Sequence, residues 1–138
     1  MKGVENWFKS QNWKAQSFQK QCWKAYAEGK SGMLHAPTGS GKTYALWGGV
    51  IEEISRSKKN PKGLNALWIT PLRALGVEIK KSTQKMLSYF NAELQVGLRT
   101  ADTPQSQRTK MQKSPPFALV STPESVHVLL AQKDHQRY

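Results

Sequence analysis

A short segment between residues 36 and 43 has the composition and spacing of a phosphate-binding loop. It reads Ala-Pro-Thr-Gly-Ser-Gly-Lys-Thr, which fits the P-loop pattern with a small residue in its first position. Two glycines let the backbone curl so that successive N–H groups point at phosphate oxygens. The lysine would reach the β- and γ-phosphates, and the last threonine hydroxyl would bind Mg²⁺. The segment therefore predicts a nucleoside triphosphate site made of Ala36, Pro37, Thr38, Gly39, Ser40, Gly41, Lys42 and Thr43, with Lys42 and Thr43 in catalytic roles.

The residues around this segment predict the elements that a P-loop needs. Residues 32–36 are predicted to form a strand before it, and apolar residues with helical spacing follow it at Trp47, Val50, Ile51 and Ile54. Short apolar runs then alternate with amphipathic stretches, which is typical of an α/β protein. We expect a parallel sheet with helices on both faces, with further strands at 64–70, 94–100 and 117–121 and helices at 16–28, 72–90 and from Pro123 onward. A glycine-rich turn with an exposed lysine is the alternative interpretation of residues 36–43.

The charge of the chain favours a polyanionic partner. The 138 residues carry a net charge of +12, and the excess is spread over both halves of the sequence. A distributed positive field suits nucleic acid, although a basic protein without such a partner is the alternative. The single cysteine, Cys22, excludes an intramolecular disulfide, and no apolar run is long enough to span a bilayer. We expect a cytoplasmic protein that does not bind membranes.

The segment Phe18-Gln19-Lys20-Gln21-Cys22-Trp23, upstream of the P-loop, carries a family resemblance. With the P-loop, it resembles superfamily 2 helicases of the DExH type. Within them it is similar to the large helicase-related (Lhr) family, and closest to the bacterial ligase-associated DEXH-box helicases. The resemblance implies that the ligand is ATP and that Gln19 reads its adenine, since an amide both donates and accepts hydrogen bonds. Trp7, Phe8 or Trp13 would either stack on the base or lie in the core.

Two further segments resemble nucleic-acid-binding motifs of the same family. Thr70-Pro71-Leu72-Arg73-Ala74-Leu75 is similar to motif Ia, and Ser121-Thr122-Pro123-Glu124-Ser125 is similar to motif Ib. Both follow predicted strands, so both are expected at the carboxyl edge of the sheet, where open α/β sheets bind ligands. An ordinary helix start, with Thr122 as cap and Pro123 in the first turn, is the alternative for the second segment. The resemblance implies backbone contacts to nucleic acid from Thr70, Pro71, Arg73, Thr122, Pro123, Glu124 and Ser125.

A third segment, Arg99-Thr100-Ala101-Asp102-Thr103, departs from the family pattern at one position. The family usually has glycine where this chain has Ala101, which removes a flexible backbone position. The resemblance still implies nucleic-acid contacts from Arg99 and Thr100. Asp102 is predicted to cap the helix that follows.

The resemblance covers nearly the whole chain but only the beginning of the family's architecture. None of the nine acidic residues forms a DExH sequence. We therefore expect residues 1–30 to form a helical region with the adenine-reading motif. Residues 31–138 would be the first part of a RecA-like domain, truncated before the DExH motif, with an incomplete first helicase lobe.

That organisation predicts the activity of the chain and of the protein it belongs to. The 138 residues alone are expected to be inactive and marginally stable. The full-length protein is expected to be an ATP-dependent helicase or translocase, with DNA favoured over RNA and DNA-repair proteins as partners. The alternatives are another P-loop NTPase and a non-enzymatic module that binds nucleotide or nucleic acid.

Overall fold

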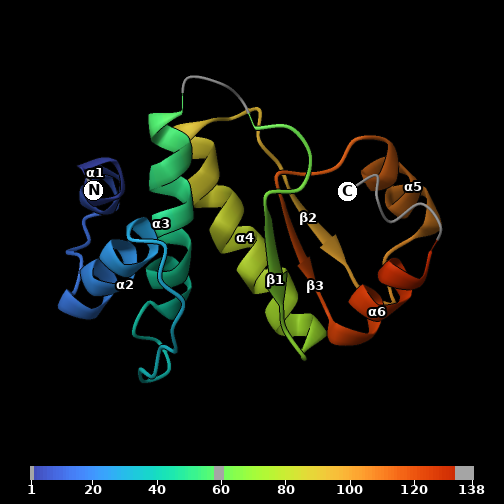
Figure 1. The fold of residues 1–138 in the computed structure, drawn as a ribbon, viewed down its shortest axis with the longest axis horizontal. Helices are drawn as coiled ribbons and strands as arrows, with labels where there is room; N and C mark the ends of the chain where they lie inside the picture. Colours follow the sequence, from blue (N-terminus) through green and yellow to red (C-terminus); the bar gives the residue numbers. More distant parts are fainter. Residues whose placement is uncertain (1, 58–60, 133–138) are drawn as a thin grey trace. The chain divides into compact units, whose positions relative to one another are not determined.

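The computed structural model describes residues 2–57 and 61–132 (Figure 1). The chain divides into two compact units. The N-terminal unit comprises residues 1–59 and 89–91, and the sheet unit comprises residues 60–88 and 92–138. Among the described residues, no helix combines the length and apolar character that a membrane span requires. The cytoplasmic location stays a prediction.

Three helices build the N-terminal unit: α1 (Lys2–Ser10), α2 (Ser17–Ala27) and α3 (Lys42–Arg56). The predicted helix at 16–28 is confirmed as α2, and Gly29, with a φ of +69°, lies just beyond its end. Helix α2 packs closely on α3 because the facing residues of α3 are glycines. A Cβ atom on Gly48 would lie 2.1 Å from the indole nitrogen of Trp23.

The buried carboxylate of Glu52 on α3 anchors the start of α1. Its Oε2 accepts a hydrogen bond of 2.9 Å from the Val4 backbone N–H, and its Oε1 lies 3.4 Å from Arg56 Nη2. Burial by itself would raise the pKa of Glu52. The N–H groups of Val4 and Gly3 and the charge of Arg56 stabilise the ionised form, and they hold the pKa below its ordinary value.

The lowered pKa of Glu52 predicts acid sensitivity of the N-terminal unit. A carboxyl with a lowered folded-state pKa contributes stability above its unfolded value of about 4.3, and that stability is lost as the pH falls through the folded-state pKa. We expect Glu52→Gln to lower the unfolding free energy at neutral pH by about 1–3 kcal/mol. The variant should also flatten the loss of stability below about pH 4. Urea unfolding at a series of pH values measures both, and parallel pH profiles for the two proteins would contradict the prediction.

A three-stranded parallel sheet forms the second unit. Its strands are β1 (Ala66–Ile69), β2 (Val96–Arg99) and β3 (Ala118–Ser121), in the order β1-β3-β2. These strands confirm the predictions at 64–70, 94–100 and 117–121, and the α/β class is confirmed with them. The helices are α4 (Arg73–Phe90), α5 (Gln105–Lys113) and α6 (Pro123–Ala131).

The strand order places helices on both faces of the sheet. The chain crosses from β1 to β2 in one direction and returns from β2 to β3 in the other. Right-handed crossovers then put α4 and α5 on opposite faces, as Figure 1 shows. Helix α4 packs tightly at Gly76, where an added Cβ would lie 3.2 Å from Leu98 Cδ1.

Side chains form hydrogen bonds with backbone groups of β2 on the edge that faces away from β3. The Val96 N–H donates to Gln84 Oε1 of α4 at 2.8 Å, and the Thr103 hydroxyl donates to the Leu98 carbonyl at 3.2 Å. These bonds occupy backbone groups that would otherwise be offered to another strand. Side chains therefore occupy one N–H and one carbonyl of this edge, which reduces its capacity to pair with another strand.

The predicted strand at residues 32–36 is wrong. Residues 31–37 have no regular secondary structure, and the Met33 side chain is 96% exposed. A strand exists only as part of a hydrogen-bonded ladder, and the sheet of the described residues contains only β1, β3 and β2. The apolar residues in this segment therefore predicted a strand that has no described partner.

Candidate nucleotide and nucleic-acid sites

The predicted phosphate-binding loop has the backbone that its glycines allow. Gly39 and Gly41 have φ values of +76° and +87°, in the left-handed region that favours glycine. Gly41 is the N-cap of α3, so Lys42 and Thr43 open the first turn of that helix. The unpaired N–H groups and the positive end of the helix dipole at this position favour an anion.

The Lys42 ammonium lies folded back over the loop. Its Nζ donates to the carbonyl oxygens of Ala36 at 2.6 Å and Pro37 at 2.8 Å. The Ser40 hydroxyl also donates to the Pro37 carbonyl, at 2.6 Å. The Lys42 ammonium is therefore held inside the loop by two neutral carbonyl oxygens.

Gln19 connects the start of α2 to this loop. Its side chain is only 3% exposed. Its Oε1 accepts from the Gln16 N–H at 2.9 Å, and its Nε2 donates to the Gly41 carbonyl at 3.1 Å. A Cβ atom on Gly41 would come within 2.6 Å of that Nε2. The structure thus brings Gln19 and the P-loop together, while the adenine-reading role of Gln19 stays a prediction.

An aromatic cluster surrounds Tyr44, the residue after the P-loop threonine. Trp7 and Phe8 are buried, and the Trp7 ring centroid lies 5.0 Å from that of Tyr44. Both rings pack in the core of the N-terminal unit, which was one of the two alternatives for them. Trp13 is 43% exposed and lies 5.5 Å from Tyr44. Sequence reasoning missed Tyr44, although its position next to Lys42 and Thr43 was an available signal.

Three threonines meet at the carboxyl edge of the sheet. The last residues of the strands, Ile69, Ser121 and Arg99, are aligned in register across β1, β3 and β2. A threonine follows the last residue of each strand: Thr70 after β1, Thr122 after β3 and Thr100 after β2. All three are buried. The segments that resemble motifs Ia and Ib and the third segment are therefore neighbours at one edge. Among the described residues, the Thr70 hydroxyl has no hydrogen-bond partner.

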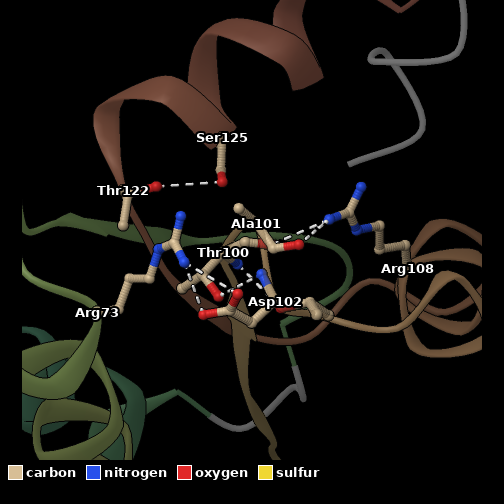
Figure 2. Close-up of polar contacts among 8 residues, drawn as sticks. Arg73, Thr100, Ala101, Asp102, Arg108, Thr122 and Ser125 are labelled. Carbon is tan, nitrogen blue, oxygen red and sulfur yellow. Dashed lines mark hydrogen bonds and ion pairs between the residues drawn. The ribbon is translucent and has the colours of Figure 1, made fainter.

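The exposed part of this edge carries Arg73 at the start of α4. Arg73 Nη1 lies 2.9 Å from each carboxylate oxygen of Asp102, which follows β2 (Figure 2). Asp102 therefore pairs with Arg73, and its predicted role as a helix cap is wrong, because α5 begins only at Gln105 with Pro104 as N-cap. Ala101 has no positive φ, so this turn does not need glycine at that position.

Helix α6 begins as predicted at Pro123, with Thr122 as its N-cap. The Thr122 hydroxyl donates to Ser125 Oγ at 3.1 Å, as Figure 2 shows, rather than accepting from a backbone N–H. Glu124 is exposed beside them, as are Pro123 and, after β1, Pro71.

Arg99 is buried, whereas Arg73 is exposed. Its side chain is 2% exposed, and its Nη2 donates to Gln132 Oε1 at 3.3 Å. The guanidinium is thus directed into the sheet unit in this structure. Its predicted contact with nucleic acid stays a prediction.

The chain belongs to the DEAD/DEAH box helicase family, whose profile matches residues 16–138. It is similar to the ATP-dependent helicase Lhr-Core of Methanocaldococcus jannaschii, with 36% identity over 94% of this chain and 17% of the relative. The Lhr helicase/uracil glycosylase of Escherichia coli is 30% identical over 94% of this chain and 10% of the relative. The solved structure of Mycobacterium smegmatis helicase Lhr bound to ssDNA and AMP-PNP superposes with a TM-score of 0.83 at 29% identity, covering 98% of this chain and 18% of that one.

These comparisons confirm the predicted helicase resemblance and the RecA-like class of fold. The chain spans less than a fifth of the length of these relatives.

Proposed function

We propose that this chain forms the ATP-binding part of the first lobe of an ATP-dependent nucleic-acid helicase of the Lhr type. The observation that carries the proposal is the P-loop with Gln19 bonded to it, since both parts of the predicted nucleotide site meet in one structure. The similarity to proteins named ATP-dependent helicases supports it. The predicted organisation, with residues 1–30 preceding a RecA-like segment at 31–138, is part of the same proposal.

In the proposed nucleotide site, the P-loop binds the phosphates of ATP. Lys42 would leave the Ala36 and Pro37 carbonyls for the β- and γ-phosphates, and the N–H groups that begin α3 would bind phosphate oxygens. The half-buried Thr43 hydroxyl, in the first turn of α3, fits a Mg²⁺ ligand. Bound Mg²⁺ would neutralise charge that develops on the phosphates.

In the proposed nucleic-acid site, the carboxyl edge of the sheet holds one strand by its backbone. Arg73 is an exposed cation there, and the starts of α4 and α6 offer N–H groups to phosphates. Contacts of this kind position a strand without reading its bases. DNA is the proposed substrate because the similar Lhr structure is described as bound to ssDNA. DNA-repair proteins are the proposed partners.

Stimulation of ATP hydrolysis by nucleic acid tests this function. The complete protein that contains these residues should hydrolyse ATP slowly alone and faster with single-stranded DNA. Arg73→Gln should reduce the stimulation by DNA while leaving the unstimulated rate unchanged. Equal rates with and without DNA and RNA would favour another kind of P-loop NTPase.

A further inference from the structure

Arg73, the exposed cation of the proposed nucleic-acid site, forms an ion pair with Asp102. Both hydrogen bonds come from one nitrogen, Nη1, which lies 2.9 Å from Oδ1 and 2.9 Å from Oδ2. The side chains are 57% and 70% exposed. A phosphate that approaches Arg73 therefore meets a guanidinium whose charge a carboxylate already neutralises.

The turn that carries Asp102 is fixed by hydrogen bonds on both sides (Figure 2). The Thr100 N–H donates to Thr103 Oγ1 at 2.9 Å, and the Asp102 N–H donates to Thr100 Oγ1 at 3.3 Å. Arg108 Nη2 donates to the carbonyl oxygens of Thr100 at 3.1 Å and Ala101 at 2.9 Å. The backbone that carries the Asp102 carboxylate is thus held in place, and Arg73 is the longer side chain of the pair.

We propose that Asp102 restrains Arg73, so that Asp102 and a nucleic-acid phosphate compete for the same guanidinium. This inference rests on the proposed function, because it assumes that the carboxyl edge binds nucleic acid. An exposed ion pair contributes little to stability, so a phosphate in the right position can displace the carboxylate. Asp102 thereby weakens the binding of a phosphate by Arg73. It sets the affinity of the site for nucleic acid and the dependence of that affinity on salt.

Replacing Asp102 with asparagine tests the restraint. Asp102→Asn removes the negative charge and keeps the size of the side chain. We expect this substitution to make the complete protein that contains these residues bind fluorescein-labelled oligothymidylate about two to five times more tightly at low salt. Because one more cation is free to release counterions, the plot of log affinity against log salt should steepen by about 0.7. Fluorescence anisotropy across a salt series measures both quantities.

Three control variants separate the restraint from a general effect of charge. Glu78→Gln removes one exposed negative charge from α4 of the same unit, and it should produce less than half of the gain. Arg73→Gln should weaken the Asp102→Asn variant more than it weakens the wild-type chain. Asp102→Glu, which keeps the charge, should retain the wild-type salt slope.

The possible results distinguish this inference from the proposed function. If the wild-type chain binds the oligonucleotide and Asp102→Asn binds equally or more weakly, the restraint is refuted and the proposed function stands. An equal gain in Glu78→Gln refutes it as well. If neither wild type nor Asp102→Asn binds, the proposed nucleic-acid site itself fails, and the restraint fails with it.

Discussion

Replacing Lys42 with alanine should weaken the binding of ATP by about tenfold to a hundredfold. In the described part of the chain, the Lys42 Nζ donates to the Ala36 and Pro37 carbonyls of its own loop, so it is available to phosphates at the cost of two hydrogen bonds to neutral oxygens. A hydrogen bond to a charged group contributes about 1.5–3 kcal/mol, and every 1.4 kcal/mol is about tenfold in affinity. Titration of the chain with a fluorescent ATP analogue in the presence of Mg²⁺ measures the loss.

Lys14→Ala is the matched control for this prediction. Lys14 is an exposed lysine of the same unit, outside the P-loop. It should bind the analogue as wild type does, and both variants should keep the wild-type circular dichroism. Undiminished binding by Lys42→Ala would remove the P-loop from the proposed site, and an equal loss in Lys14→Ala would assign the effect to overall charge.

The predicted site depended on features that are local in the sequence. The P-loop was predictable because its glycines must adopt positive φ values and its lysine follows them directly, and the structure gives Gly39 and Gly41 that backbone. The edge of the sheet was predictable because Thr70 and Thr122 follow apolar runs that form parallel strands. In both cases the residue type and its immediate neighbours contained the physical cause.

The failures concern contacts between residues distant in the sequence. The apolar residues at 32–36 did not reveal whether a neighbouring strand was there to pair with them. Asp102 has the residue type of a helix cap, and only the fold shows that Arg73, 29 positions away, pairs with it instead. The hydrogen bond between Gln19 and Gly41 spans 22 positions, and it was the resemblance, not any periodicity, that had assigned Gln19 to the nucleotide site.

Replacing Gly48 with alanine should destabilise the N-terminal unit by about 2–4 kcal/mol. In an exposed helix the change would stabilise by about 0.5–1 kcal/mol, because alanine is the better helix former. Here the added Cβ would lie 2.1 Å from Trp23 Nε1, which is far closer than van der Waals contact, so the indole ring would have to move. Overpacking costs about 1–3 kcal/mol, and displacement of the ring also removes the 3.0 Å hydrogen bond from Trp23 Nε1 to the Tyr44 carbonyl, which adds about 1 kcal/mol.

Tryptophan fluorescence during urea unfolding isolates this effect, because four of the five tryptophans lie in the N-terminal unit. Gly32→Ala is the matched control, since Gly32 has open space around its Cα and no positive φ. It should leave the midpoint of unfolding unchanged. Since Tyr44 follows the P-loop threonine, a displaced Trp23 should also loosen the first turn of α3, so Gly48→Ala should bind the ATP analogue more weakly than Gly32→Ala. A wild-type midpoint in Gly48→Ala would mean that α2 and α3 are not packed through this glycine, and the support of the P-loop by α2 would then rest on Gln19 alone.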